Sequence, residues 1–480
     1  MLTVLHTSDW HLGRRLYGKP RYTEFRAFLA WLLQAIREQA VDVLVVAGDV
    51  FDTTAPSNQA QNLYYDFLSQ VCQTCCRHVI IVAGNHDSPS FLEAPKQLLK
   101  SFNIHIIGSM SEHAPDEVIT LYDAAGHPEL IIMGVPYLRD RDVRQVSSGE
   151  RLDDKERKLS QGIQRHYQDI AAIALQQQAQ LKRQYNRTIP MVATGHLFTV
   201  GGKTTEGDGV RELYVGSLGS VGADVFHPNI DYVALGHLHV PQTVGNAAHI
   251  RYSGSPIAMG FGESRQQKQV HLLRFAADPE LLNQPIHPLT TQLVATENPQ
   301  PSTPTLDPIS QHGSMDLFAD EVVSAAPVTA HPHAPYHKPY NVAKLSDTTL
   351  LQSLCVPTFQ PLQTIKGDWQ TIQTTLQNLK TSGQSVWLEV VYDGREVMGD
   401  LSEKITRLIE GTALEVLRLK NLQKRDQLIK SQRLDETLEE MNEKQVFARC
   451  LAAHGVTEAQ QPMLWARYGE VLDSLQDDQP

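Results

Sequence analysis

The sequence predicts an α/β fold in which helices cover a central β-sheet, and a second, smaller module that follows later in the chain. In the first 277 residues, short apolar runs alternate with segments of helical spacing, which is typical of a sheet layered with helices. The same alternation returns near residue 360, beyond a long proline-rich stretch. A chain of 480 residues is also too long for one ordinary core, so we expect two or three domains.

The first part of the chain contains candidates for both kinds of layer. A helix is expected over 24–39, where apolar residues recur from Phe25 to Ile36 at helical spacing. Further helices are expected over 58–76 and 154–184. The expected strands are the short apolar runs at 2–6, 43–46, 79–82, 131–133, 191–193, 232–235 and 270–275.

Composition suggests how the whole chain is divided. We expect residues 1–277 to form the main domain and residues 278–348 to form a disordered linker or insertion, because the latter are rich in proline, threonine, serine, alanine and histidine. Residues 349–424 should form the smaller α/β module. Its expected strands are 361–365, 385–391 and 414–419, and its expected helices are 369–379 and 401–410.

The last segment, 425–480, has a charged helical pattern with an apolar stripe. That pattern fits a helical hairpin packed on its own domain, and it fits equally a docking surface for a partner helix. The sequence leaves both interpretations open.

Charge and hydropathy exclude some classes of protein. The longest apolar runs are strand-sized, so we expect no membrane span. The first residues have the pattern of a strand, so we expect that the chain has no signal peptide and that the protein is cytoplasmic. A net charge of −12 argues against a surface that attracts nucleic acid everywhere. DNA binding would need local basic patches, bound cations or a partner.

Five short motifs place Asp, His or Asn just after a predicted strand. They are Asp9-Trp10-His11, Gly48-Asp49, Gly84-Asn85-His86-Asp87, Gly195-His196 and Gly236-His237-Leu238-His239. Ligands of α/β sheets bind at the carboxyl ends of strands, and glycine lets the backbone turn sharply beside an ion. Side chains two residues apart in an extended chain project to the same side, so Asp9 and His11 can converge. The neighbours Asn85 and His86 point apart, so that one can bind a metal while the other faces a substrate.

Seven of these side chains are candidate metal ligands: Asp9, His11, Asp49, Asn85, His196, His237 and His239. One ion cannot use them all, whereas two ions that share a carboxylate can. Oxygen and imidazole donors without thiolate favour Mn²⁺, Fe²⁺ or Zn²⁺ over Mg²⁺ or Ca²⁺. A single Asp-x-His after a strand is more often a turn or a helix cap. Five motifs in this order, each at a strand end, predict a two-metal site that polarises a phosphate.

Together the five motifs resemble the signature of the calcineurin-like metallophosphoesterases. The sequence around them, at 6–13, 46–53, 193–197 and 251–256, resembles the SbcD family of bacterial DNA nucleases. The resemblance covers residues 1–275 strongly and 355–425 moderately. It implies a β-sandwich flanked by helices, a capping domain at 349–424 and C-terminal helices that dock on a partner. The stretch 278–348 is longer than the family pattern.

The same resemblance implies a role for each motif residue. One Mn²⁺ would be held by Asp9, His11, Asp49 and His239, and the other by Asp49, Asn85, His196 and His237; Mg²⁺, Fe²⁺ or Zn²⁺ could replace Mn²⁺. His86 would face the scissile phosphate and help to protonate the leaving oxygen. Asp87 would orient His86. Asp52 is given no catalytic role.

In function, the resemblance implies a nuclease that cuts DNA ends and hairpins in DNA repair, recombination and replication. It would act with an SbcC-type ATPase that carries a long coiled coil, as a homodimer within a heterotetramer, with 58–76 as the candidate dimer helix. The chain lacks the Gly-x-x-x-x-Gly-Lys-[Ser/Thr] phosphate loop, so ATP dependence would come from another subunit. The alternatives are a phosphatase or small-molecule phosphodiesterase on the same core, and a non-catalytic scaffold. The complete ligand set argues against the scaffold.

Overall fold

The computed structural model describes residues 1–144, 152–199, 202, 221–283, 341–396 and 398–422, with a few residues between 447 and 468. The chain divides into two compact units. The first unit contains Met1–Thr364, Gln384–Glu389 and Ala413–Arg418, and the second contains Ile365–Gly383, Val390–Thr412 and Leu419–Pro480.

A seven-stranded sheet forms one half of the core of the first unit, with the strand order β14-β15-β13-β1-β4-β5-β6. Its strands are β1 (Leu2–Thr7), β4 (Val43–Ala47), β5 (His78–Val82), β6 (Ile104–Ile107), β13 (Gln269–Phe275), β14 (Val342–Ser346) and β15 (Thr349–Cys355). Strands β1, β4, β5 and β6 run parallel, whereas β13 is antiparallel to both of its neighbours. The carboxyl ends of β1, β4 and β5 therefore share one edge of the sheet.

A six-stranded sheet forms the other half, with the strand order β11-β12-β10-β9-β8-β7. Its strands are β7 (Val118–Tyr122), β8 (Pro128–Met133), β9 (Met191–His196), β10 (Tyr232–Gly236), β11 (Gln242–Val244) and β12 (Ala247–Tyr252). Buried side chains from both sheets pack against each other, among them Val4, Val45, Ile132 and Val192. This packing confirms the β-sandwich.

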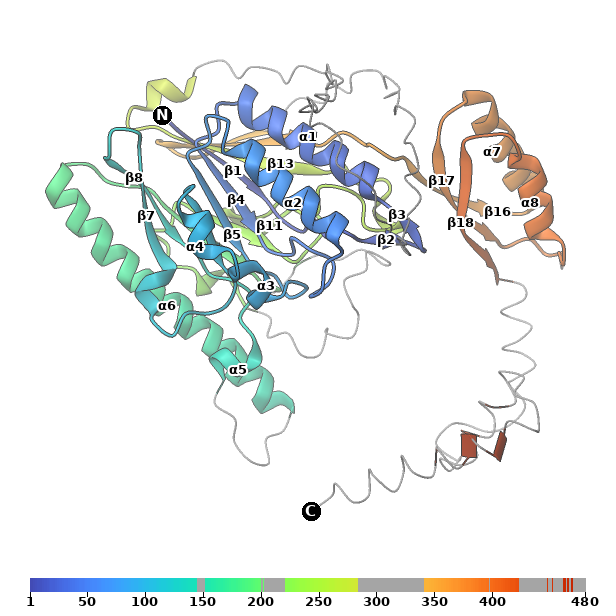
Figure 1. Ribbon diagram of the computed structural model, residues 1–480, viewed down its shortest axis with the longest axis horizontal. Helices are drawn as coiled ribbons and strands as arrows, with labels where there is room; N and C mark the ends of the chain where they lie inside the picture. Colours follow the sequence, from blue (N-terminus) through green and yellow to red (C-terminus); the bar gives the residue numbers. More distant parts are fainter. Residues whose placement is uncertain are drawn as a thin grey trace, which may run out of the picture. The chain divides into compact units, whose positions relative to one another are not determined.

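Helices cover the outer face of each sheet, as the alternating pattern predicts (Figure 1). On the larger sheet, α1 (Tyr22–Glu38) and α2 (Asn58–Val71) bury an apolar face that includes Phe28 and Phe67. On the smaller sheet, α6 (Leu152–Tyr185) packs in the same way. The helix expected over 58–76 is shorter than predicted, because the chain leaves it after Val71.

Shorter elements connect these layers. They are the hairpin of β2 (Arg15–Leu16) and β3 (Lys19–Pro20) and the helices α3 (Pro89–Glu93), α4 (Lys96–Lys100) and α5 (Asp140–Val143). None of the helices in the described ranges is long and apolar enough to cross a membrane.

The expected domain boundary at 348/349 does not match the sheet. Strand β15 pairs with β13 from Gln269↔Cys355 to Phe275↔Thr349, and β14 adds the edge strand beyond it. The chain therefore completes the larger sheet before it enters the small module. The signal for β14 was weak because this edge strand is exposed or only partly buried along its length and directly follows the proline-rich stretch.

The small α/β module has the expected elements. Its three strands have the order β16-β17-β18. They are β16 (Leu362–Gly367), β17 (Val386–Tyr392) and β18 (Leu414–Asn421), and the helices are α7 (Trp369–Ser382) and α8 (Leu401–Ile409). Helix α7 begins at Asp368, whose side chain accepts a hydrogen bond from the backbone N–H of Thr371. The segment 425–480 lies almost entirely outside the described residues.

Two histidines are fully buried in the larger sheet. His6 on β1 faces His271 on β13, with ring centroids 5.8 Å apart. His6 Nδ1 lies 2.9 Å from the Tyr232 hydroxyl, and His271 Nδ1 lies 3.2 Å from Ser353 Oγ. Burial and the charge of Arg251 lower the pKa of His271 to about 3, and burial beside His271 lowers the pKa of His6 well below 6.5. Both rings are therefore neutral in the folded protein.

We expect this pair to make the fold sensitive to acid. Above pH 6.5 these two histidines bind equal numbers of protons in the folded and the unfolded chain. Below pH 6.5 they take up protons in the unfolded chain that they cannot take up in the folded chain. The free energy of unfolding should therefore fall as the pH drops from 6.5 toward 3, by about 1.4 kcal/mol per pH unit for each histidine. Urea unfolding in EDTA at several pH values measures this slope. His271→Gln should make the slope shallower, and an unchanged slope would contradict the assignment.

Candidate metal centre

The five motifs meet at one edge of the sandwich, where strands of both sheets end. Asp9 and His11 follow β1, Asp49 follows β4 and Asn85 follows β5. From the smaller sheet, His196 is the last residue of β9 and His237 follows β10. The backbone N–H of His237 donates to Asp9 Oδ1 over 2.9 Å, so the two sheets are joined here. The predicted convergence at the strand ends is present.

The backbone is strained at this edge. Asp9, His11, Asp49 and His237 have φ values of 53°, 48°, 51° and 99°, in the left-handed region that side chains disfavour by about 1 kcal/mol or more. Neighbouring loops hold the strained residues in place. The N–H of Asp9 donates to the carbonyl of Gly48 over 3.0 Å, and the N–H of His11 donates to the carbonyl of Asp49 over 3.0 Å.

Two motif glycines are required by close packing at the same place. A Cβ at Gly236 would lie 1.9 Å from the carbonyl oxygen of Ala47. A Cβ at Gly48, where φ is 89°, would lie 2.2 Å from Nδ1 of His196. The glycines thus let the two strand ends approach closely, as expected from the sequence.

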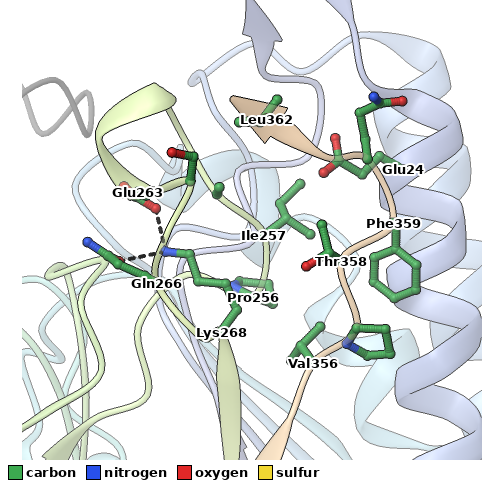
Figure 2. Close-up of a pocket in the computed structure, with 14 residues that line it drawn as sticks. Glu24, Pro256, Ile257, Glu263, Gln266, Lys268, Val356, Thr358, Phe359 and Leu362 are labelled. Atoms are coloured by element: carbon green, nitrogen blue, oxygen red, sulfur yellow. Dashed lines mark hydrogen bonds and ion pairs between the residues drawn. The ribbon is translucent and has the colours of Figure 1, made fainter. Parts of the chain in front are cut away.

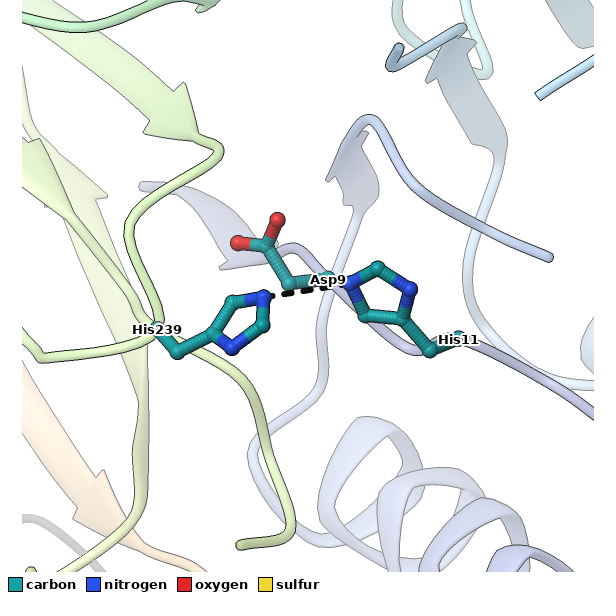
Figure 3. A group of neighbouring side chains, drawn as sticks. All are labelled: Asp9, His11 and His239. Carbon is teal, nitrogen blue, oxygen red and sulfur yellow. Dashed lines mark hydrogen bonds between the residues drawn. The ribbon is translucent and has the colours of Figure 1, made fainter. Parts of the chain in front are cut away.

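Asp9, His11 and His239 form the first group of ligand atoms. One potential ligand atom from each lies within 4.8 Å of the others, and all three side chains are buried. Figure 3 shows the two imidazoles facing each other, with the carboxylate of Asp9 beside them; His11 Nε2 lies 3.1 Å from His239 Nε2. Buried ring nitrogens that converge with a carboxylate form a donor set that suits a divalent cation.

A second group lies around Asn85. Its Oδ1 atom lies 3.1 Å from Nε2 of His196 and 3.0 Å from Nδ1 of His237. Asp49 lies between the two groups, because its Oδ2 atom is 3.2 Å from His196 Nε2 and 3.6 Å from His11 Nε2. This position suits a carboxylate that two ions share.

Protonation states in the site also fit a cation. Burial alone would raise the pKa of Asp49, but His196 and His11 hold it well below its usual range, so Asp49 is ionised. Burial and the neighbouring His196 lower the pKa of His237 to about 3, which leaves this imidazole neutral. Metal ions bind ionised carboxylates and neutral imidazoles, so Asp49 and His237 have the protonation states that a divalent metal needs. Burial opposes a proton on His196, but Asp49 raises the pKa of this ring to about 9, so a metal would displace a proton from it.

His86 is oriented by a residue other than the expected one. Its Nδ1 atom lies 2.9 Å from the backbone carbonyl of Asp52. The carboxylate of Asp87 instead accepts three backbone hydrogen bonds, from Val50, Phe51 and Gly84, over 2.9–3.1 Å. Asp87 therefore ties the loop after β4 to the loop after β5. The expectation that Asp87 orients His86 directly is wrong, because His86 Nδ1 pairs with the carbonyl of Asp52 while the Asp87 carboxylate pairs with backbone N–H groups.

Two carboxylates support metal-ligand candidates from behind, and the sequence did not point to either. Asp52 Oδ1 lies 3.4 Å from His11 Nδ1; burial opposes its ionisation, but His11 and Arg14 lower the pKa of Asp52 to about 2. Glu263 Oε1 lies 3.3 Å from His239 Nδ1. Asp52 follows Asp49 by three residues and was given no catalytic role, whereas Glu263 is 24 residues from His239 and carries no local signal.

Comparison with known proteins decides the family. A family model described as calcineurin-like phosphoesterase matches residues 2–241, and one described as type 5 capsule protein repressor C-terminal domain matches residues 358–455. The SbcD subunit of the nuclease SbcCD from Escherichia coli (strain K12) is 31% identical over 476 residues, which cover 99% of this chain and 98% of that protein. The chain belongs to the SbcD family of calcineurin-like metallophosphoesterases.

Other members of the SbcD family match a little over half of the chain. The SbcD subunit of the nuclease SbcCD from Rhodobacter capsulatus is 34% identical over 281 residues, 57% of this chain and 67% of that protein. The corresponding Bacillus subtilis protein is 32% identical over 273 residues, 57% of this chain and 66% of that protein. Family and site together make this SbcD-type chain a metal-dependent hydrolytic nuclease, and the phosphatase alternative is not favoured.

Proposed function

We propose that this chain uses two Mn²⁺ ions to hydrolyse phosphodiester bonds at DNA ends and hairpins. The observation that carries the proposal is the convergence of seven donor side chains on the edge of the sandwich, in two groups that meet at Asp49. When bound, the ions would supply the charge that polarises the phosphodiester and activates a water molecule. The proposed ligands are Asp9, His11, Asp49 and His239 for one ion, and Asp49, Asn85, His196 and His237 for the other.

His86 is the proposed acid of the reaction. Its Nδ1 atom is engaged by the carbonyl of Asp52, so Nε2 is left for the substrate, and the ring would act as an acid in its doubly protonated form, with one proton on each nitrogen. The ring lies 4.8 Å from that of His11, beside the first ligand group, and is only partly buried. From this position His86 would stabilise the charge that develops on the phosphate and help to protonate the leaving oxygen.

We also propose a partner and an assembly. The E. coli relative is named as a subunit of SbcCD, which supports an SbcC-type ATPase with a coiled coil as the partner of this chain. Residues 425–480 are the proposed docking segment, and α2 is the proposed dimer helix within a heterotetramer. The complex would act in the cytoplasm in DNA repair, recombination and replication.

Cleavage of end-labelled duplex and hairpin DNA tests the proposal. We expect the purified chain to cut both substrates with Mn²⁺, to be inactive in EDTA, and to change its rate when an SbcC-type ATPase and ATP are added. A small phosphodiester serves as the comparison substrate. If the chain hydrolyses the small phosphodiester but leaves DNA intact under all these conditions, the proposed metal centre is supported and the proposal that DNA is the substrate is wrong.

A further inference from the structure

A buried ion pair lies directly behind His239. Glu263 is fully buried in a short turn after β12, and Lys268, which precedes β13, is 7% exposed at its side chain. Lys268 Nζ donates a hydrogen bond to Glu263 Oε2, and the two residues line the same small pocket (Figure 2). The pair lies outside the metal centre but touches one of its ligand candidates.

The pair contacts both the side chain and the backbone of His239. Glu263 Oε1 lies 3.3 Å from the ring Nδ1 atom, and Lys268 Nζ donates to the carbonyl of His239 over 3.2 Å. The other oxygen of Glu263 is held by further donors, the hydroxyl of Ser255 at 3.2 Å and the N–H of Met259 at 3.0 Å. These donors fix the carboxylate so that Oε1 points at the imidazole.

Stability alone is a poor reason for such a pair. Taking two charges out of water costs about as much as their attraction returns, so buried ion pairs can often be replaced by apolar residues without loss. A ligand in the adjoining pocket is also a poor reason, because a cavity of about 30 Å³ has room for little more than water. What remains is the contact with His239, since a carboxylate that accepts the second N–H of an imidazole fixes its tautomer and orientation.

We infer that Glu263, held by Lys268, is a positioning residue that presents Nε2 of His239 to the metal held by Asp9, His11 and His239. The inference rests on the proposed metal centre. When the neutral ring donates its Nδ1–H to Glu263, Nε2 carries the lone pair, and this atom lies 3.1 Å from Nε2 of His11. The second group has no carboxylate in this position at His196, whose Nδ1 lies 3.0 Å from the carbonyl of Ala47. Loss of Glu263 should therefore weaken one metal position and leave the other intact.

Mn²⁺ titration followed by electron paramagnetic resonance of the free ion tests this inference on the full chain. We expect wild type to bind two ions, and Glu263→Gln to bind one ion as before and the other about 10–100-fold more weakly. The matched control is Glu117→Gln. Glu117 is also a buried carboxylate that contacts an imidazole, with His166 Nε2 at 2.8 Å, but it lies directly before β7 and its partner belongs to α6, so neither residue is part of a motif. This control should lose stability and keep both ions.

A double variant separates positioning from folding. Glu263→Gln leaves the charge of Lys268 buried beside a neutral amide. Combining it with Lys268→Met gives a double variant from which both charges of the pair are removed. The double variant should regain thermal stability in EDTA while one Mn²⁺ position stays weak. Wild-type affinity at both positions in either Glu263 variant would overturn the inference and leave the metal centre standing. A wild-type chain that binds fewer than two ions would overturn the metal centre itself, and the inference with it.

Discussion

Asp49→Asn should abolish both Mn²⁺ binding and DNA cleavage. Asp49 is the carboxylate that lies within 3.2 Å of His196 and 3.6 Å of His11, so the substitution removes the negative charge that the two ligand groups share. We expect bound Mn²⁺ to fall from two ions to none at concentrations that saturate wild type. The cleavage rate should fall at least about 1,000-fold, because losing the metals removes about 4 kcal/mol or more of transition-state stabilisation.

Metal content after desalting and single-turnover cleavage of duplex DNA measure the two effects. The matched control is Asp231→Asn, which changes a partly buried aspartate whose Oδ2 accepts the N–H of Met191 over 2.8 Å, at the amino end of β9 rather than at its carboxyl end. This control should keep two ions and the wild-type rate. If Asp49→Asn still binds two ions with unchanged affinity, Asp49 is not the shared ligand.

His86→Gln should slow cleavage about 100–10,000-fold, the range of a lost general acid, while metal binding is kept. Metal binding should be kept because His86 is not one of the seven proposed metal ligands. The Nδ1 atom of His86 is engaged by the carbonyl of Asp52, whereas the seven donor atoms come from other side chains. Glutamine can keep the bond to that carbonyl, but it cannot transfer a proton at neutral pH.

The measurement combines single-turnover DNA cleavage with Mn²⁺ titration of the same variant. His166→Gln is the control, because His166 also makes one side-chain hydrogen bond, to Glu117, but lies on α6. It should cleave DNA at the wild-type rate. A His86→Gln protein that cuts as fast as wild type would remove His86 from the mechanism, and one that has lost its metals would make it a ligand.

The backbone explains why these residues occur together. Each motif lies where a strand ends and the chain turns at once, in most cases next to a glycine. The carboxylate of Asp87 accepts hydrogen bonds from the N–H groups of Val50, Phe51 and Gly84. From the sequence alone, a contact between Asp87 and His86 was equally plausible. Asp87 thus contributes through the loops that carry Asp49 and Asn85, rather than through His86.

Much of the fold follows from local patterns. The expected helices at 24–39 and 154–184 correspond to α1 and α6, and all seven strands expected in the first 277 residues are present. Two of the strands that were not predicted, β11 and β14, are short and partly exposed and lack an apolar run. Their formation depends on a neighbouring strand that supplies hydrogen bonds, and a single-sequence pattern does not contain that neighbour.

The family and the donor residues could be recognised from the sequence, because each donor lies within a few residues of its own strand and the five motifs are local signals. How those donors are supported became visible only in the folded chain. The carboxylate of Glu263 reaches His239 across 24 positions of sequence, and the carbonyl of Asp52 reaches His86 across 34. Such contacts join separate loops, and their partners are chosen by the packing of two sheets rather than by spacing along the chain.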